Sequence, residues 1–268
     1  MGRRTGCSAR LRSRPWSSPD HHVGHPRHPD REHIFAFLLA FGRNLLGHGC
    51  TAGAHLGLQP LAGQPLVDHP AGAEVQLLYL HQAVFELAGK TMLLVGVGAI
   101  GLHTSAAGPS LRPARHRPTS PADRALPHVD RVVGPDELRS VLPEADFVVV
   151  TAPLTPETAG MFDAAAFAAM QPSAYFVNIG RGGTVVEPDL IAALQNGAIA
   201  GAGLDVFAEE PLPPESPLWD LPNVIITSHY SGLSPEYDAR ALEIFLDNLH
   251  RYRAGEPMTN VVDKRLVY

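Results

Sequence analysis

Short apolar runs with few polar residues recur along the chain from residue 92 onward. A strand that is buried on both faces has this composition, because a solvated face would place a polar residue at every second position. The runs therefore predict a parallel sheet that is covered on both sides. The predicted strands cover 92–97, 147–150, 175–179, 202–207 and 224–227.

Segments with helical signals lie between and around these runs. Pro135 and Asp136 are typical of a helix start, and Gly197 is typical of a helix end. The last helix carries Leu242, Phe245, Leu246 and Leu249 on one face. Strands that alternate with helices predict the α/β class. The predicted helices cover 31–46, 135–142, 163–170, 188–196 and 235–254.

Composition and charge narrow the function classes. A chain of 268 residues that is 45% hydrophobic is long enough for two modest domains. The formal net charge of −6 gives no electrostatic reason to bind nucleic acid or an anionic membrane, and no apolar run approaches the length of a membrane span. Cys7 and Cys50 are too few for a disulfide framework. We expect a cytoplasmic protein with a small-molecule partner.

The first thirty residues differ in kind from the rest. Arg, Ser, Pro and His dominate them, and so few apolar residues cannot offset the entropy of ordering the segment. We therefore expect a disordered tail at 1–30. Its His21, His22, His25 and His28 can be interpreted as a metal cluster or as a solvated tail, and the second interpretation is favoured because nothing nearby would orient the rings.

The stretch LLVGVGAIG at 93–101 has the form of a strand that enters a glycine turn. In such a turn Gly96 permits the bend, Gly98 lets the backbone approach a pyrophosphate, and Gly101 lets helix and strand pack closely. The phosphates would then lie at the start of the following helix, near Ala99 and Ile100. The motif alone is weak evidence, because an Ala- and Gly-rich strand exit also produces it by chance.

The sequence after this turn is less favourable. Gly108, Pro109 and Pro113 interrupt it, so we expect neither a good helix nor a second strand between 102 and 121. Arg115 and Arg117 lie where the 2′-phosphate of NADP would be met, or they lie on a solvated loop.

Motifs farther along the chain are more specific. They are TAPLTPET at 151–158, VNIGRGGTVVE at 177–187, GAGLDVFAEEPL at 201–212 and NVIITSHYSG at 223–232. In order and spacing they resemble the motifs of the D-isomer-specific 2-hydroxyacid dehydrogenases, and the nearest group is the one that reduces glyoxylate, hydroxypyruvate or phosphohydroxypyruvate. The resemblance implies a Rossmann-type cofactor domain at 82–235 that uses NAD or NADP, and a homodimer. It also implies an incomplete, N-terminally truncated substrate domain formed by 31–81 and 236–268.

The resemblance assigns catalytic roles to Arg181, Glu210 and His229, and the chemistry suits these residue types. A 2-oxo acid needs its carboxylate neutralised and its carbonyl polarised, for which a guanidinium is suited. A proton must reach the developing alkoxide, and an imidazole oriented by a carboxylate can deliver it. By the same resemblance Asp205 holds the nicotinamide carboxamide. The predicted cofactor contacts are Gly96, Gly98, Ala99, Ile100, Gly101, Arg115, Arg117, Ala152, Pro153, Thr158, Ile179, Gly180, Asp205 and His229.

The segments 47–72 and 102–125 depart from the family, since both are rich in Gly, Pro, His and Ala. Our hypothesis is that they are translated out of frame, because a frame slip changes composition abruptly and leaves the flanking motifs intact. The expected function is reduction of a short 2-oxo acid to the D-2-hydroxy acid with NAD(P)H. The alternative is a catalytically impaired remnant or a cofactor-sensing binding protein. The helix at 235–254 is then expected to expose its apolar stripe, because in the family it packs on the partner lobe.

Overall fold

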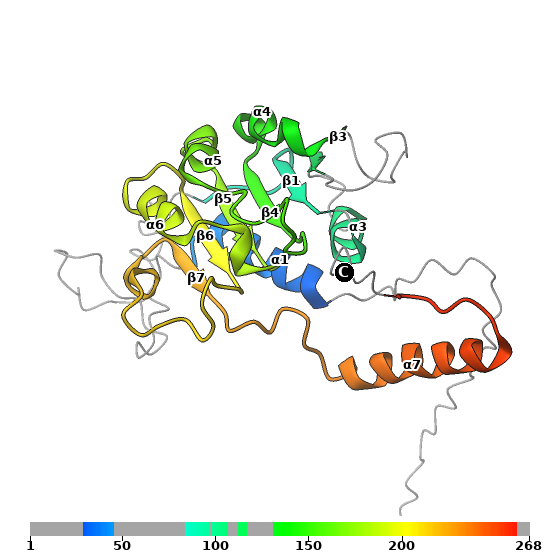
Figure 1. Cartoon of the computed structure of the whole chain (residues 1–268). Coiled ribbons are helices and arrows are strands. Elements are labelled where there is room, and N and C mark those ends of the chain that lie inside the picture. The colour runs from blue at the N-terminus through cyan, green and yellow to red at the C-terminus, as the bar shows by residue number, and fades with distance from the viewer. Residues whose placement is uncertain (1–28, 46–83, 97, 107–111, 117–130, 262–268) are drawn as a thin grey trace, which may run out of the picture.

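Parallel strands form one sheet at the centre of the chain (Figure 1). The structure is a computed structural model that describes residues 29–45, 84–96, 98–106, 112–116 and 131–261. Within these residues the sheet has seven strands in the order β3-β2-β1-β4-β5-β6-β7, and every neighbouring pair is parallel. The strands are β1 (Thr91–Val95), β2 (Arg112–His116), β3 (Arg131–Val133), β4 (Phe147–Val150), β5 (Tyr175–Asn178), β6 (Gly201–Leu204) and β7 (Val224–Ile226).

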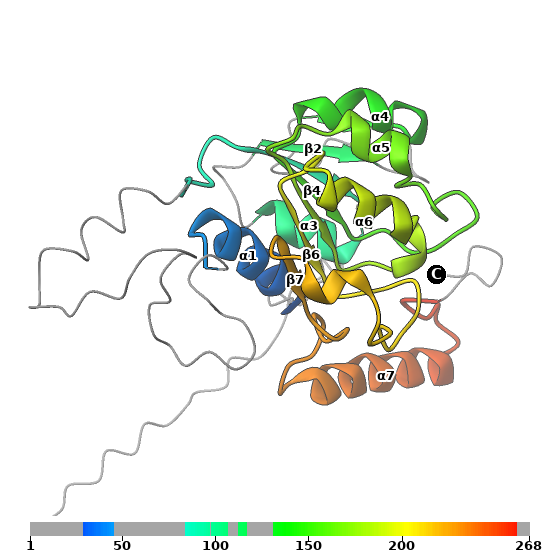
Figure 2. The same ribbon diagram turned by 90° about the vertical axis from the view of Figure 1, so that its left-hand side faces the viewer.

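Helices cover both faces of the sheet (Figures 1 and 2). One face packs against α1 and α3, and the other against α4, α5 and α6. A doubly wound sheet with this strand order is of the Rossmann type, which confirms the predicted fold class. The helices are α1 (Pro29–Gly42), α3 (Ala99–Ala106), α4 (Leu138–Val141), α5 (Ala164–Ala169), α6 (Glu187–Gln195) and α7 (Tyr237–Ala254), with short 3-10 turns at Pro135–Glu137, Leu142–Glu144, Gly182–Thr184 and Pro217–Asp220.

Two apolar clusters, one on each face, form the core. On the side of α1, Ile34, Phe37 and Leu38 pack against β1, β4 and β5. On the other face, Phe162, Phe167 and aliphatic side chains of α4 to α6 fill the space above the same strands. Strands β4 and β6 are buried along their whole length, which explains their unbroken apolar sequence. The core thus fixes the carboxyl ends of the strands along one edge of the sheet.

A helix follows the glycine turn, although the sequence predicted no good helix there. Residues 99–106 form α3, which ends before Gly108 and Pro109. Its Thr104 and Ser105 are buried, and each hydroxyl donates to a carbonyl of the same helix, at 2.8 and 2.7 Å. The expectation rested on Gly108, Pro109 and Pro113, and it is wrong because α3 ends at Ala106, before it reaches any of them.

A second strand also forms, although the sequence predicted none between 102 and 121. Arg112–His116 form β2, which pairs in parallel with β1 although its sequence is polar. The pairing uses backbone groups, so it does not require apolar side chains. Pro113 is tolerated because β3 begins its pairing only at Ala114, so Pro113 has a neighbouring strand on one side. Helix and strand both form within 102–125, and the out-of-frame origin of that segment stays a hypothesis.

Helix α1 makes its core contacts with the central sheet. The resemblance assigns residues 31–81 to a remnant of the substrate domain, yet α1 packs directly on the central sheet. The reason is that its apolar side chains match the apolar face of β1, β4 and β5, and Phe41 stacks on Tyr175 with ring centroids 4.5 Å apart. The described contacts of α1 are thus with the sheet, and the division of the chain into domains stays a prediction.

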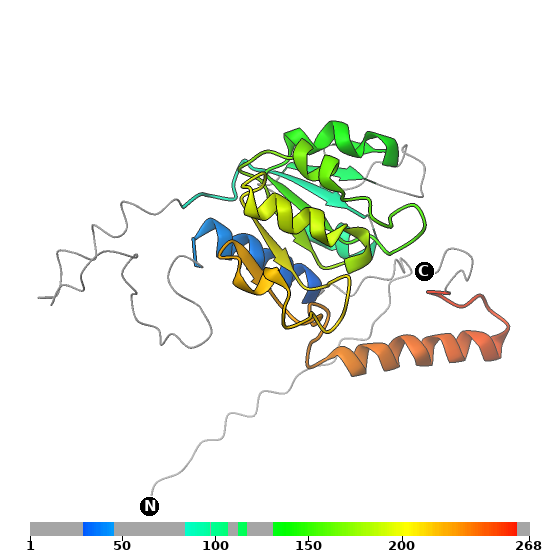
Figure 3. The ribbon, with the colours of Figure 1, turned by 60° about the vertical axis from the view of Figure 1, so that its left-hand side comes forward.

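Helix α7 leaves the body of the molecule and runs beside it (Figures 1 and 3). None of its residues is buried, and Leu242, Phe245, Leu246 and Leu249 are 55%, 62%, 43% and 41% exposed. The expectation that this stripe is exposed is therefore met within the described residues. No described helix is both long and apolar enough to cross a membrane.

Several expectations fall on residues outside the described ranges. They are residues 1–28 of the tail with its histidines, the loop at 47–72, and Arg117. The tail was expected to extend to residue 30, and this is wrong at its end, because Pro29 and Asp30 form the first turn of α1. For Arg115 the structure gives the strand position, opposite Leu94, and not the side chain. The proposed contact of these arginines with a 2′-phosphate stays a prediction.

Candidate active site

The turn between β1 and α3 has the geometry that its glycines suggest. Gly96 adopts φ +111°, and a Cβ placed on it would lie 2.6 Å from the backbone nitrogen of Ala152. A Cβ at Gly101 would collide with the carbonyl oxygen of Gly96. Larger residues are therefore excluded at both positions by the fold itself.

Gly98 is different, because within the described residues no atom beyond its two chain neighbours lies within 4 Å of the position that its Cβ would occupy. It is exposed, as is Ala99, the first residue of α3. Backbone N–H groups at a helix start attract phosphate oxygens, and a glycine lets them approach closely. The open space at Gly98 thus fits a pyrophosphate, although the fold does not itself require glycine there.

The loop after β4 lies against this turn. Thr151 donates its hydroxyl to the carbonyl of Gly96 at 3.1 Å, and Ala152 is in contact with the backbone positions of both Gly96 and Gly180. Thr158 is buried, and its hydroxyl accepts from the backbone N–H of Thr155 at 2.8 Å and donates to the carbonyl of Pro153 at 2.7 Å. Thr158 therefore shapes the loop from inside, while Pro153 is half-buried at its start.

Arg181 follows β5 directly and has a fixed backbone with an exposed side chain. Its carbonyl accepts from the Asn178 amide at 3.1 Å and from the Thr184 hydroxyl at 2.7 Å, and both donors are buried. Its guanidinium donates to the carbonyl of Gly180 at 2.7 Å. Ile179 is buried against α1, so its side chain belongs to the core.

Glu210 and His229 lie next to each other although nineteen residues separate them. The Nδ1 atom of His229 is 2.7 Å from Oε2 of Glu210, and the other carboxylate oxygen accepts from the backbone N–H of Phe207 at 3.0 Å. The carboxylate is thereby held from both ends, and it orients the ring so that Nε2 is the nitrogen left for proton exchange. The side chains of His229 and Glu210 are 48% and 37% exposed.

The pKa of Glu210 lies below its ordinary value. Partial burial raises the pKa, but the hydrogen bond from His229 and the one from the backbone of Phe207 favour the carboxylate and outweigh burial. Glu210 is therefore ionised at neutral pH, as an orienting group for an imidazole must be.

Asp205 is fully buried at the end of β6, and it organises the loop that carries His229. Its Oδ1 accepts from the Thr227 hydroxyl at 2.6 Å and from the Tyr230 N–H at 3.1 Å, and its Oδ2 accepts from the Ser231 N–H at 3.0 Å. Burial raises the pKa of Asp205, but these hydrogen bonds outweigh burial, so the pKa lies below its ordinary value. A contact with a nicotinamide carboxamide stays a prediction.

The lowered pKa of Asp205 makes stability depend on pH. A carboxyl whose pKa is lower in the folded state stabilises the fold above its unfolded pKa of about 3.9, and this contribution is lost as pH falls through the folded value. We expect Asp205→Asn to lower the melting temperature at neutral pH and to flatten its decline below about pH 4. Melting curves across that range check this, and an unchanged decline in the variant would contradict it.

The sequence did not predict two residues that contact the site, Asp30 and His33 on α1. His33 Nε2 is 2.9 Å from the Thr227 hydroxyl, and Asp30 accepts from the Ser231 hydroxyl at 2.9 Å. Burial lowers the pKa of His33, and the charges of Asp205 and Asp30 oppose this. No local pattern signals such contacts, because the partners lie 194 and 201 residues apart.

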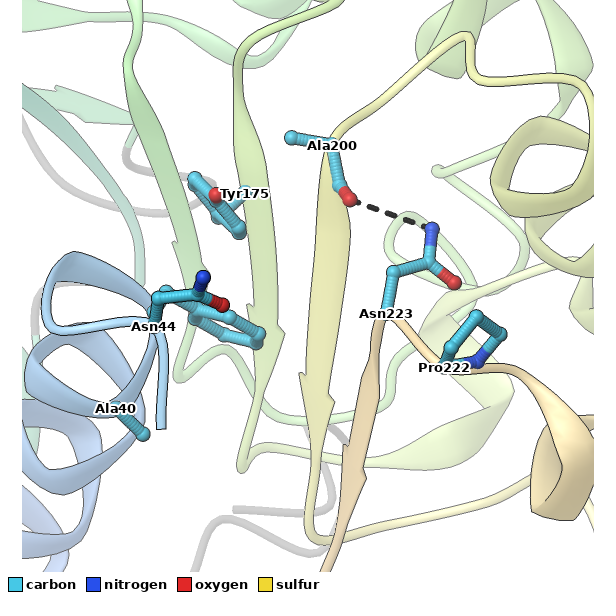
Figure 4. A pocket seen from close by; sticks show the side chains of 7 residues that line it. Ala40, Asn44, Tyr175, Ala200, Pro222 and Asn223 are labelled. Atoms are coloured by element: carbon cyan, nitrogen blue, oxygen red, sulfur yellow. Dashed lines mark hydrogen bonds between the residues drawn. The ribbon is translucent and has the colours of Figure 1, made fainter. Parts of the chain in front are cut away.

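Neither of two cavities is lined by Arg181, Glu210 or His229, although the second borders Thr158, one of the predicted cofactor contacts. One of about 270 Å³ lies between α1 and the amino ends of β5, β6 and β7, where Tyr175, Ala200 and Asn223 line it (Figure 4). There the Asn223 amide donates to the Ala200 carbonyl at 3.2 Å. Another, of about 360 Å³, lies between Pro135–Arg139 and the outer side of the loop at 157–161. Open α/β sheets bind ligands at the carboxyl ends of their strands. The polar side chains at those ends therefore identify the site better than cavity volume does.

The chain is similar to known proteins over most of this region. A family model described as the NAD binding domain of D-isomer specific 2-hydroxyacid dehydrogenases matches residues 76–231. Glyoxylate/hydroxypyruvate reductase B of Salmonella newport is 41% identical over 180 residues, which are 65% of this chain and 54% of the relative. An uncharacterized protein of Corynebacterium melassecola is 37% identical over 176 residues, 65% of this chain and 57% of that one. The chain spans little more than half the length of these relatives.

Solved structures give a similar result. The NADPH-dependent glyoxylate/hydroxypyruvate reductase of Sinorhizobium meliloti, in complex with NADP and sulfate, aligns with a TM-score of 0.70 at 29% identity, covering 90% of this chain and 69% of that one. A D-isomer specific 2-hydroxyacid dehydrogenase of Xanthobacter autotrophicus, in complex with NADPH and MES, aligns with a TM-score of 0.71 at 28% identity, covering 90% and 68%.

Proposed function

The chain belongs to the D-isomer specific 2-hydroxyacid dehydrogenase family, and on this premise we propose that it reduces a short 2-oxo acid to the D-2-hydroxy acid with NADH or NADPH. The observation that supports this best is the ion pair of His229 and Glu210, at 2.7 Å, in the loops that follow β7 and β6. Reductases of glyoxylate and hydroxypyruvate among the relatives favour a substrate of that size.

The dinucleotide, when bound, supplies the hydride that reduces C2 of the substrate. The turn at Gly96–Gly101 fits its pyrophosphate, because Gly98 leaves open space beside the start of α3. Ala152, Pro153 and Gly180 would hold it at the ends of β4 and β5, with the remaining predicted contacts around them.

Residues of the chain would neutralise the substrate's negative charge and supply the proton that the reduction needs. Arg181 would bind the substrate carboxylate and polarise its carbonyl, for which a forked and permanently charged guanidinium is suited. Its bond with the Gly180 carbonyl uses one of the five N–H donors of the guanidinium, so donors remain for the substrate. His229 would donate a proton from Nε2 to the developing alkoxide oxygen, and Glu210 stabilises the imidazolium before the transfer.

The proposal is tested by replacing Arg181 with Lys. Lysine keeps the charge and loses the planar fork, so we expect kcat/KM for glyoxylate or hydroxypyruvate to fall about thirtyfold, equivalent to about 2 kcal/mol, with most of the loss in KM. NADPH and NADH oxidation followed by absorbance measures it.

Arg251→Lys is the matched control, because Arg251 forms an ion pair with Asp247 on the same helix, α7, away from these loops. Equal losses in both variants would argue against a substrate contact of Arg181. If the wild-type chain binds NADPH, seen as a rise in melting temperature, and turns over no 2-oxo acid, the chain is a cofactor-binding protein and not an enzyme. A homodimer and a cytoplasmic location are part of the proposal, and sedimentation of the purified chain tests the first.

A further inference from the structure

The loop at 227–231 holds its histidine in an unusual backbone conformation. His229 has φ +55°, in the left-handed region that residues other than glycine seldom adopt. Such a conformation persists only where the surroundings determine it. The backbone N–H of His229 donates to the carbonyl of Asp205 at 2.8 Å, which fixes one point of the loop. The ring position depends on how the rest of the loop is held.

One attachment comes from His33, on α1. Its Nε2 lies 2.9 Å from the hydroxyl oxygen of Thr227, two residues before His229. That hydroxyl is 2.6 Å from Oδ1 of Asp205, an ionised acceptor, so its single proton is donated there. The hydroxyl can therefore only accept from His33, which fixes Nε2 as the nitrogen that carries hydrogen. The His33 ring also packs edge-on against Tyr230, with centroids 5.2 Å apart.

A second attachment comes from Asp30, one turn earlier on the same helix. Its Oδ1 accepts from the Ser231 hydroxyl at 2.9 Å, two residues after His229. Both side chains are buried, at 8% and 5% exposed. Residues three apart on a helix lie on one face, so Asp30 and His33 point to the same side.

We propose that α1 positions the acid/base histidine, with His33 and Asp30 as positioning residues that act through Thr227 and Ser231. The loop is held two residues before and two residues after His229 by a helix that is itself fixed in the core by Ile34 and Leu38, each 0% exposed. The kinetic part of this inference rests on the proposed function. The structural part does not.

The test uses the full chain with His33→Leu, His33→Gln and Ile34→Val. Leucine removes the donor to Thr227, whereas the glutamine amide can restore it. Ile34→Val destabilises the same helix and removes no hydrogen bond to the loop, so it is the matched control. The first readout is amide hydrogen exchange at Tyr230 and Ser231 in the absence of cofactor. We expect it to rise about tenfold in His33→Leu and to stay near wild type in the other two.

The second readout is kinetic. We expect kcat to fall about tenfold in His33→Leu while the Kd for NADPH changes less than about twofold. We expect His33→Gln to restore most of kcat.

Asp30 is tested by a double-mutant cycle of Asp30→Ala, Ser231→Ala and the double variant. If the two act as one link, the double variant loses no more kcat than either single one.

Several outcomes overturn the proposal. Wild-type exchange and kcat in His33→Leu would do so, as would parallel losses in His33→Leu and Ile34→Val, because both changes would then act through stability alone. If His33→Leu does not fold, Ser231→Ala gives the decision, since it removes one hydroxyl and keeps the packing. If the wild-type chain turns over no 2-oxo acid, the proposed function fails, and the exchange rates still decide whether α1 holds the loop.

Discussion

Replacing His229 with Asn is expected to lower kcat about a thousandfold, within the range that general acid–base catalysis contributes. The hydride can reach the carbonyl carbon only as a proton reaches the oxygen, and an amide cannot supply that proton. Asparagine is chosen because it tolerates the left-handed backbone that His229 adopts, so the loop keeps its conformation. Single-turnover absorbance of NADPH measures the loss, and the Kd for NADPH is expected to stay within about threefold of wild type.

His250→Asn is the matched control, since His250 is exposed on α7. Glu210→Gln provides a graded comparison. It keeps the shape of the side chain and removes the charge that favours imidazolium, so a smaller loss of about thirtyfold is expected. Activity of His229→Asn close to wild type would remove the assigned proton donor, and with it the proposed mechanism.

Gly98→Ala is expected to weaken NADPH binding about a hundredfold, equivalent to about 2.7 kcal/mol, while the fold is retained. Among the described residues, the added methyl group meets no atom within 4 Å except those of its chain neighbours, so their packing does not oppose it. It would stand where the pyrophosphate must approach the backbone. Fluorescence titration of NADPH gives the Kd, and a melting curve without cofactor shows whether stability is unchanged.

Gly134→Ala controls for the loss of a glycine, because its Cβ would meet only a carboxylate oxygen of Glu137 at 3.8 Å. Gly101→Ala is expected to behave differently from Gly98→Ala, since its Cβ collides with the Gly96 carbonyl and the fold itself suffers. If Gly98→Ala binds NADPH as tightly as wild type, the dinucleotide does not pass this turn.

The sheet could be predicted from sequence because most of its strands are buried on both faces. An unbroken apolar run such as Phe147–Val150 is typical of a strand in the middle of a parallel sheet, and the structure makes it strand β4. The predicted strands at 202–207 and 224–227 overran β6 and β7, because Asp205 and Thr227 hydrogen-bond to each other just beyond the ends of these strands. Boundaries depend on such contacts, which local patterns do not contain.

The segment after the glycine turn could not be predicted, for a related reason. Thr104 and Ser105 satisfy their hydroxyls within α3, and β2 is held by backbone pairing with β1. Neither interaction leaves an apolar signature. The pairing of Glu210 with His229 follows from a family resemblance, and the structure gives it a distance. Asp30 and His33 required the folded chain, because only folding brings α1 to the loop.

The left-handed backbone of His229 has a consequence for engineering. Glycine adopts that conformation without steric cost, so by its backbone alone it should be favoured over alanine there by about 1 kcal/mol. The ion pair that glycine would remove is half exposed and offsets little of that gain. A library selected only for heat resistance would therefore tend to discard the residue assigned to proton transfer, and such a selection needs turnover as a second criterion.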